Sequence, residues 1–338
     1  MMVRSAFSPW CIGVFVLRYL SVFICALFVS SAQAQTAAPG PGQPYPSRLI
    51  RIVVPWPAGG TTDIIGRIIG QKLNESLAQP VIIDNRPGAS GSVGSEIVAR
   101  AAPDGYTLLV VSMGTLTMNQ FVSKLSYDPV NDLAPISLVA NVPAVLASHP
   151  SLPVSDIRGL IALARAKPGQ LNVASGSNAY ELAIELLKMR GQLDMVHVRY
   201  KGGGAAINDL LGGHMMLVIT GAPAVTPHVK SKKLRMLAVT TSKRAIDLPD
   251  VPTIGETLPG YEFNNWTGIL APAGTPRPVM DKLNAEVVHI LELPAVHQTF
   301  RGLGAEPTRS TQQEFGRVLR SDAEKWGKLI KATGFRPD

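Results

Sequence analysis

Short runs of β-branched and other apolar residues alternate along this chain with longer segments whose apolar positions recur at helical spacing. The run LIRIVV predicts a strand, and the isoleucines and leucine that follow recur on one helical face. The first half therefore reads as strand 49–54, helix 63–77, strand 80–84, helix 92–101 and strand 107–111. This βαβαβ order is typical of a mainly parallel sheet with helices on both faces.

Two extended stretches interrupt this order, at residues 133–148 and 263–271, and we interpret each as a crossing between two sheets. Between them the alternation resumes, with helices that begin at 155, 178 and 205 and strands at 171–174, 195–199, 215–220 and 235–240. The sequence therefore predicts an α/β protein of two domains with a cleft between them. The expected domain 1 comprises residues 48–140 and 266–338, and domain 2 comprises residues 141–265.

Two helices near the carboxyl end carry recognisable start signals. Thr275 is expected to be an N-cap with Pro276 at the first helical position. Thr311 and Glu314 are spaced as a capping box. The apolar stripe of this last helix comprises Phe315, Val318, Leu319 and Trp326.

The amino-terminal segment has the features of a secretory signal peptide. Arg4 and Arg18 supply positive charge, residues 19–29 form an apolar run, and Ala32-Gln33-Ala34 is a small-x-small cleavage motif. We predict a signal peptide over residues 1–34, cut between Ala34 and Gln35, a flexible leader over 35–47, and a periplasmic location. An uncleaved membrane anchor is the alternative.

Cysteine usage and charge then exclude several classes of protein. Both cysteines, Cys11 and Cys25, lie in the predicted signal peptide, so the mature chain has no disulfide, thiolate metal site or cysteine nucleophile. Removing residues 1–34 leaves 30 basic against 24 acidic residues, a net charge of +6. These charges are scattered, which argues against a nucleic-acid partner. The positive net charge favours attraction of anionic solutes.

Glycine, serine and threonine cluster where predicted strands end. The first such end reads PWPAGGTTD and runs into a helix, whose free N–H groups make an anion site. Similar ends occur at 85–92, 112–115, 174–178 and 221–223. Because ligands of open α/β sheets lie beyond the carboxyl ends of the strands, these loops predict a pocket of backbone N–H groups and hydroxyls. A glycine-rich turn in which Asp63 only caps the helix is the alternative for the first loop.

Motifs for enzymatic chemistry are missing from the sequence. There is no G-x-S-x-G elbow, no phosphate-binding loop and no dinucleotide fingerprint. The six histidines never form an H-x-x-x-H or H-x-H pair, and we interpret His197 as a structural residue within its strand. We therefore expect no catalytic residue, no metal and no cofactor, although an enzyme assembled from distant residues stays open.

Several segments together resemble the Bug-type solute-binding receptors of tripartite tricarboxylate transporters. The resemblance runs from about residue 45 to 334. Its segments are YPSRLIRIVVPWPAGGTTD (45–63), DNRPGASG (84–91), APDGYTL (102–108), YDP (127–129), YKG (200–202), DLLGG (209–213), LPDVPT (248–253) and APAGTP (271–276).

This resemblance implies a two-domain periplasmic-binding-protein fold of type II, a Venus flytrap that closes on a small carboxylate and delivers it to a membrane permease. The cargo implied is a dicarboxylate, tricarboxylate, amino acid or aromatic acid, and we expect a monomer. Carried over by position, the ligand-binding residues are Trp56, Ala58, Gly59, Gly60, Thr61, Thr62, Asp63, Ser112, Met113, Gly114, Thr115, Ser175, Gly176, Ser177, Asn178, Gly221 and Ala222.

The sequence departs from the family pattern at two places, Ala179-Tyr180-Glu181 and Thr220-Gly221, which puts the identity of the ligand in doubt. Arg86 is the only basic residue in these loops, so they neutralise little of the charge of a bound anion. A mono- or dicarboxylate is therefore easier to accommodate than a citrate-like trianion. A receptor that senses an effector and signals to a partner would use the same fold, and an enzyme on this fold is a further alternative.

Overall fold

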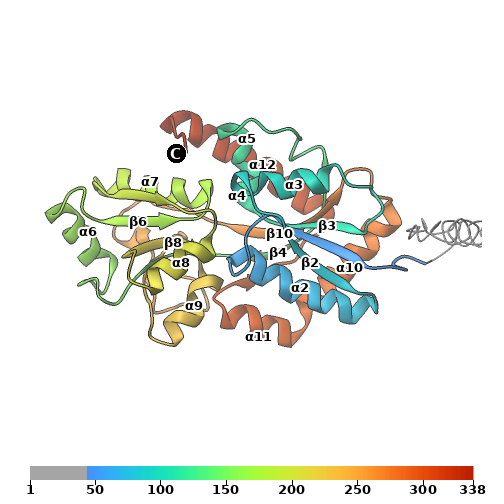
Figure 1. Ribbon diagram of the computed structural model, residues 1–338, viewed down its shortest axis with the longest axis horizontal. Coiled ribbons are helices and arrows are strands. Elements are labelled where there is room, and N and C mark those ends of the chain that lie inside the picture. Colours follow the sequence, from blue (N-terminus) through green and yellow to red (C-terminus); the bar gives the residue numbers. More distant parts are fainter. Residues whose placement is uncertain (1–43, 338) are drawn as a thin grey trace, which may run out of the picture. The chain divides into compact units, whose positions relative to one another are not determined.

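The chain folds around two β-sheets, one of six strands and one of five. The computed structural model describes residues 44–337 (Figure 1). The predicted signal peptide and most of the predicted leader lie outside the described residues. The first sheet has the strand order β11 (Glu306–Pro307), β4 (Leu133–Asn141), β10 (Trp266–Pro272), β3 (Thr107–Ser112), β1 (Ile50–Val54), β2 (Val81–Asn85). The second has the order β7 (Val196–Arg199), β6 (Asn172–Ser175), β8 (Leu217–Gly221), β5 (Ala144–Ser148), β9 (Arg235–Val239).

Strand directions confirm the α/β prediction and show where it is incomplete. In the first sheet β1 pairs in parallel with β2 and β3, and β10 runs antiparallel to β3 and β4. In the second sheet β6 pairs in parallel with β7 and β8, and β5 runs antiparallel to β8 and β9. The reversed strands β5 and β10 lie in the two segments predicted as crossings, and the short β11 runs antiparallel to β4 at the edge of the first sheet. A crossover helix brings the chain back to the edge where the previous strand began, so the next strand is parallel to it. A strand that the chain enters directly from the other sheet has no such helix before it and runs in the opposite direction.

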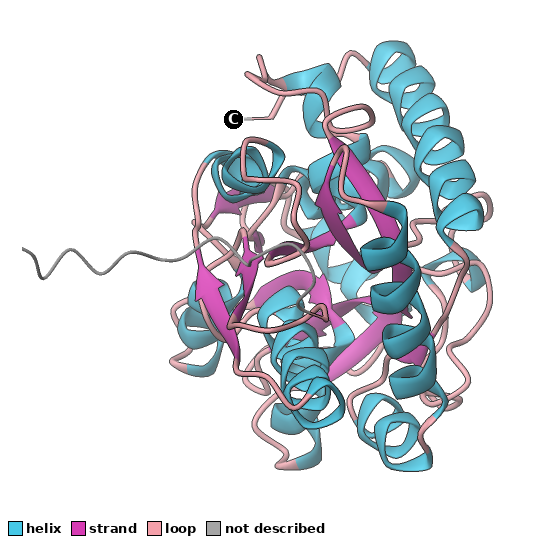
Figure 2. Cartoon of the chain, turned by 90° about the vertical axis from the view of Figure 1, so that its right-hand side faces the viewer, coloured by secondary structure: helices cyan, strands magenta, loops and turns pink. Residues whose placement is uncertain are grey.

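Helices cover both faces of the strands (Figure 2). They are α2 (Thr61–Leu77), α3 (Ser92–Ala99), α4 (Met113–Thr117), α5 (Asn119–Val122), α6 (Ile157–Ala166), α7 (Asn178–Gly191), α8 (Gly203–Leu211), α9 (Ala222–Lys230), α10 (Arg277–Glu292), α11 (Pro294–Gly302) and α12 (Gln312–Thr333), with 3-10 turns at Ala89–Gly91 and Ile254–Glu256. Among these described helices none is long and apolar enough to cross a membrane.

The period of two along each strand divides its side chains between two cores. Ile52 and Val54 of β1 pack in the cluster that contains α2 and α10, whereas Val53 packs in the cluster that contains α3 and α12. Leu108 and Leu109 of β3 are divided in the same way. Both strands are therefore buried on both faces, which is why β3 is apolar from Leu108 to Val111. In β1 only the half-buried Arg51, which pairs with Asp84, interrupts the apolar residues.

The predicted helix starts have different outcomes. The capping box of Thr311 and Glu314 is confirmed at the start of α12, and Phe315, Leu319 and Trp326 are buried as predicted. The predicted N-cap at Thr275 is wrong: Pro276 is the N-cap of α10, and the Thr275 hydroxyl donates to the Pro272 carbonyl at 2.8 Å instead. That bond closes the turn before the helix, so the hydroxyl is not available to cap it.

Four helices were not predicted from the pattern: α4, α5, α9 and α11. The first two have five and four residues, too short for a helical period to show. In α9 the prolines at 223 and 227 resemble turn signals, although Pro223 occupies the first turn, where its missing N–H costs nothing.

Candidate functional site

A narrow cavity lies between the strand ends of the two sheets. It has a volume of about 30 Å³, and its lining combines residues from both sheets. These are Trp56, Pro57, Gly60, Thr61, Thr62, Ser112, Gly176, Ser177, Tyr180, Gly203 and Thr220. None of them is charged. We call this space the inner cavity.

The starts of three helices lie among the lining residues. Thr61 begins α2 after the N-cap Gly60, Ser177 is the N-cap of α7, and Gly203 begins α8. No side-chain cap bonds the first N–H groups of α2 or α8. Because the amino end of a helix carries partial positive charge, the inner cavity attracts an anion without any cationic side chain in its lining.

Asp63 organises the first loop from behind. Its carboxylate accepts hydrogen bonds from the Gly59 N–H at 2.9 Å, from Asn85 Nδ2 at 2.9 Å and from Arg67 Nε at 3.0 Å. Asn85 Nδ2 also donates to the Trp56 carbonyl at 2.9 Å. Burial raises the pKa of the Asp63 carboxyl, but the three hydrogen bonds outweigh burial and hold the pKa below its ordinary value. Asp63 is therefore ionised, and its carboxylate stabilises the conformation of the loop through these hydrogen bonds.

Seven of the residues predicted to bind ligand line the inner cavity: Trp56, Gly60, Thr61, Thr62, Ser112, Gly176 and Ser177. The other ten do not line it: Ala58, Gly59, Asp63, Met113, Gly114, Thr115, Ser175, Asn178, Gly221 and Ala222. Ala58 and Gly59 are exposed at the loop tip. Met113 is buried in the core, where its sulfur accepts from Trp326 Nε1.

Four lining residues were not among those predicted: Pro57, Tyr180, Gly203 and Thr220. Tyr180 and Thr220 belong to the two segments that depart from the family pattern. Tyr180 lies in the first turn of α7, and its phenol oxygen accepts from Asn265 Nδ2 at 3.0 Å. Burial raises the pKa of the Tyr180 phenol, so this group is neutral and keeps its hydrogen-bond donor.

Glycines allow the two sides of the cleft to approach closely. A Cβ atom added at Gly114 would lie 2.4 Å from Ala179 Cβ, and one added at Gly221 would lie 2.5 Å from Thr61 Oγ1. A Cβ at Gly202 would lie 2.8 Å from the Pro57 ring. Cavities that hold small molecules commonly measure about 300–1,000 Å³, so the inner cavity is that of a closed cleft.

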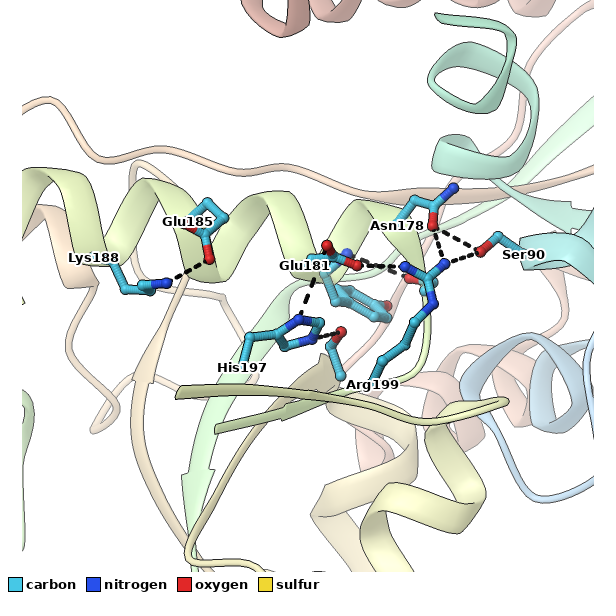
Figure 3. A network of polar contacts seen from close by, with 10 residues as sticks. Ser90, Asn178, Glu181, Glu185, Lys188, His197 and Arg199 are labelled. Carbon is cyan, nitrogen blue, oxygen red and sulfur yellow. Dashed lines mark hydrogen bonds and ion pairs between the residues drawn. The ribbon is translucent and has the colours of Figure 1, made fainter. Parts of the chain in front are cut away.

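Direct hydrogen bonds also span the cleft (Figure 3). Ser90, in the loop after β2, donates to Asn178 Oδ1 at 2.9 Å, and Asn178 Nδ2 donates to Asn119 Oδ1 at 3.0 Å. The guanidinium of Arg199 reaches from β7 to Ser90 Oγ at 3.0 Å. Beside the inner cavity, Thr61 Oγ1 donates to the Gly221 carbonyl at 3.3 Å. These hydrogen bonds hold the two sides of the cleft together.

Arg199 also belongs to a buried polar network on α7 and its neighbouring strands (Figure 3). Its NH1 group lies 2.7 Å from Glu181 Oε2, and Glu181 Oε1 lies 3.9 Å from His197 Nδ1. His197 Nε2 in turn is 2.8 Å from Ser175 Oγ. The order serine, histidine, glutamate matches that of a hydrolase triad, but Ser175 has 0% exposure and offers no oxygen to a substrate.

A wider space, which we call the outer pocket, adjoins the inner cavity and shares Trp56, Pro57 and Gly176 with it. It has a volume of about 570 Å³. Its remaining lining residues are Pro87, Gly88, Ala89, Ser90, Arg199, Tyr200 and Lys201. The outer pocket therefore carries the cationic side chains that the inner cavity lacks.

Another hollow, of about 460 Å³, lies where both crossings pass. Asn141, Val142 and Pro143 line it from the first crossing, and Asn264 and Asn265 from the second. None of the residues predicted to bind ligand lines this hollow. Within residues 44–337 there is also no group of three histidine, cysteine, aspartate or glutamate side chains placed to hold a metal ion.

Comparisons with known proteins show the family of this chain. The model of the tripartite tricarboxylate transporter family receptor matches residues 65–335. Protein BugT of Bordetella pertussis is 36% identical over 309 residues, which are 90% of this chain and 94% of BugT.

Solved structures agree as well. The structure of an R. palustris protein with adipate superposes with a TM-score of 0.84 at 35% identity, over 87% of this chain and all of that chain. MatC from Rhodopseudomonas palustris with bound malate superposes with a TM-score of 0.79 at 30% identity, over 85% of this chain and all of that chain. Both are carboxylate-bound proteins of the same fold. On this evidence the chain belongs to the receptors of the tripartite tricarboxylate transporter family, Bug-type periplasmic solute-binding proteins.

Proposed function

We propose that this chain captures a small carboxylate in the periplasm and delivers it to a tripartite tricarboxylate-type membrane permease, without catalysing a reaction. The observation that supports this most directly is the inner cavity, where the starts of α2, α7 and α8 lie around a lining of hydroxyls and glycines with no charged side chain. Such a lining suits one carboxylate group, which helix amino ends and hydroxyls hold by hydrogen bonds.

Capture requires that the cleft opens, because the inner cavity is too small to admit a solute from outside. We place the division between residues 48–140 plus 266–338 and residues 141–265. The connections near Asn141–Pro143 and Asn264–Asn265 are then the hinge. Opening about this hinge separates Thr61 from Gly221 and Ser90 from Asn178, and closing on a carboxylate restores both contacts.

The relatives support a dicarboxylate among the possible cargoes, since one similar structure contains adipate and another contains malate. The lining of the inner cavity has no arginine side chain that could neutralise several carboxylates. This disfavours a citrate-like trianion. We expect the mature chain to begin at Gln35 and to act as a monomer.

Thermal denaturation of the mature chain, stripped of bound solute, against a panel of mono-, di- and tricarboxylates tests this function. A carboxylate present at about one hundred times its dissociation constant stabilises the folded protein by about 2.7 kcal/mol. Neutral analogues such as the corresponding amides should leave the melting temperature unchanged. The proposed function would be falsified if no acid in the panel raised the melting temperature.

Delivery to a permease is tested separately from binding. Deletion of the chain should abolish uptake of the radiolabelled acid that the binding assay identifies. If uptake is intact and transcription changes instead, the chain is an effector-sensing receptor. Conversion of the bound acid during a prolonged incubation would identify an enzyme, although the buried Ser175 supplies no accessible nucleophile.

A further inference from the structure

The hollow of about 460 Å³ at the two crossings is separate from the cleft, and we call it the hinge hollow. Residues 141–143 and 264–265 line it from the crossings, residues 241–247 from the proposed domain 2, and residues 304–306 from the proposed domain 1. It shares no lining residue with the inner cavity or the outer pocket. Because sites for small molecules commonly measure about 300–1,000 Å³, the hinge hollow is large enough for a solute of its own.

Ion pairs fix the loop that forms one wall of the hinge hollow. The Arg244 guanidinium donates to the Glu256 carboxylate through Nε at 2.8 Å and NH2 at 2.7 Å, and its NH1 donates to the Pro249 carbonyl at 2.9 Å. Asp247 of the same loop pairs with Arg301 of α11 at 2.9 Å, which joins the two proposed domains beside the hollow. This wall is therefore formed in advance, and a guest does not have to order it on binding.

Two opposite charges in the lining of the hinge hollow lack an ion-pair partner. The charged lining residues are Lys243, Arg244, Asp247 and Glu306, and the middle two are paired as described. Lys243 and Glu306 are both exposed, and neither takes part in an ion pair of the described part of the chain. Lys243 lies on the wall from the proposed domain 2, and Glu306 lies on β11 in the proposed domain 1. A guest with one anionic and one cationic group would match both.

Asn265 is an independent indication that a hydrogen-bond donor binds here. Its side chain is 7% exposed and lines the hinge hollow, and its Oδ1 is buried with no hydrogen-bond partner among residues 44–337. A buried acceptor without a donor is costly in a folded protein, and an ammonium group carries three donors. Asn265 Nδ2 donates to the phenol oxygen of Tyr180, which lines the inner cavity. This side chain therefore connects the hinge hollow with the cleft.

We propose that the hinge hollow binds a small zwitterion with an apolar side chain, of the type of a free aliphatic amino acid, and that this guest stabilises the closed cleft. Its carboxylate pairs with Lys243, and its ammonium group pairs with Glu306 and donates to Asn265 Oδ1. Its side chain packs against Ile246, a lining residue that is 67% exposed.

The effect on the cleft follows from the origin of the walls. Since they come from both proposed domains, the shape of the hinge hollow depends on the angle between these domains. A guest that fits the shape found with the cleft closed shifts the population toward that state, and it thereby tightens binding of the cargo. This inference rests on the proposed function, because it adds an effector to the same receptor.

Calorimetric titration with L-leucine tests the site. The matched probes are 4-methylpentanoate, which lacks the ammonium group of leucine, and 3-methylbutylamine, which lacks its carboxylate. The cleft is first saturated with the carboxylate that the thermal denaturation panel identifies, so that leucine cannot occupy it as cargo. We expect leucine to bind and each analogue to bind about tenfold more weakly. Lys243→Gln and Glu306→Gln should each weaken leucine binding by about three- to tenfold, because each removes one charged contact at an exposed residue.

The coupling between the two sites is measured in the reverse order. Saturating leucine should lower the dissociation constant of the carboxylate by at least about fivefold in wild type. The same leucine concentration should have little effect in the double variant of Lys243→Gln and Glu306→Gln. Lys124→Gln and Asp194→Asn are the controls, since each removes one charge from an exposed residue that does not line the hinge hollow. Both should keep the full effect of leucine.

Four results would overturn the zwitterion site while leaving the receptor function intact. They are no leucine binding by the saturated receptor, equal binding of all three probes, binding of leucine without a change in carboxylate affinity, and an effect that persists in the double variant. Failure of every acid in the panel to bind wild type would instead overturn the receptor function, and with it the effector that depends on it.

Discussion

The hydroxyl of Ser90 donates a hydrogen bond to Asn178 Oδ1 at 2.9 Å, from a loop of the first sheet to the first residue of the helix α7 on the second sheet. The two residues are 88 positions apart in the chain, and their bond joins the two sides of the cleft. Arg199 shares both partners, since it contacts Ser90 Oγ and Asn178 Oδ1. These three side chains therefore link the two sides of the cleft by direct contacts.

Ser90→Ala should shift the protein toward the open state. A net hydrogen bond contributes about 0.5–1.5 kcal/mol, so the ratio of closed to open molecules should fall by about two- to twelvefold. Small-angle scattering of the unliganded protein should show a larger radius of gyration, and the dissociation constant for its carboxylate should rise by at most the same factor, because the apparent affinity follows the closed fraction. Ser231→Ala is the control, because the Ser231 hydroxyl bonds only within the end of α9. An unchanged dissociation constant in Ser90→Ala would contradict this role.

Gly221→Ala should block closure without damaging either side of the cleft. Gly221 has φ −69° and ψ 142°, which alanine adopts freely, but its Cβ would lie 2.5 Å from Thr61 Oγ1 across the cleft. We expect the melting temperature of the unliganded protein to stay within a few degrees of wild type and carboxylate binding to weaken by more than about a hundredfold, since the closed state carries the binding contacts.

The control for this steric block is Gly159→Ala on α6. An added Cβ there meets its nearest neighbour, Asp156 Oδ1, at an ordinary 3.4 Å. Binding should be normal in this variant. If Gly221→Ala also binds its carboxylate with wild-type affinity, then the closed cleft seen in the structure is not the binding state.

Local sequence signals predicted the elements well, because each depends on residues close together in the chain. The capping box at Thr311 and Glu314 needs only four residues, and the apolar run of β1 needs five. The lining residues Gly60, Ser112 and Ser177 were also predicted, since strand ends of one sheet share an edge and the residue types at that edge are visible in the sequence.

Side-chain direction and cross-cleft geometry could not be predicted in the same way. Met113 follows a strand end, yet α4 turns its side chain into the core against Trp326. Tyr180 lies beyond the strand end, but the first turn of α7 brings it to the inner cavity. The bond from Ser90 to Asn178 depends on how two sheets approach, and no local pattern encodes that relation.

Trp56→Phe should distinguish the contribution of the indole N–H to binding from that of the aromatic ring. The variant keeps an aromatic side chain beside Gly91 but removes the buried, unpaired N–H. In the unliganded protein the gain from removing that donor, about 1–3 kcal/mol, opposes the loss of packing from the smaller ring, so we expect little net change in stability. Affinity for the carboxylate should fall by about three- to tenfold, as measured by calorimetric titration. A variant that binds as tightly as wild type would show that the indole N–H makes no bond to the solute.

Asp63→Asn should destabilise the first loop and change its response to acid. The carboxyl of Asp63 is 2% exposed, and hydrogen bonds hold its pKa in the folded protein below the ordinary value. Its ionised form therefore stabilises the fold above the unfolded-state pKa of about 3.9, and this contribution is lost as the pH falls through the lower folded-state pKa. The amide that replaces it presents an NH₂ group to Asn85 or Arg67, which are themselves donors. We expect the free energy of unfolding to fall by about 1–3 kcal/mol at pH 7.

Urea denaturation of both proteins from pH 7 to pH 3 should show the difference in unfolding free energy shrinking as wild type loses the charge of Asp63. Glu75→Gln, at an exposed acid further along α2, should change the free energy of unfolding by no more than about 0.5 kcal/mol at pH 7. A constant difference across the whole pH range would show that the ionised state of Asp63 does not support the loop.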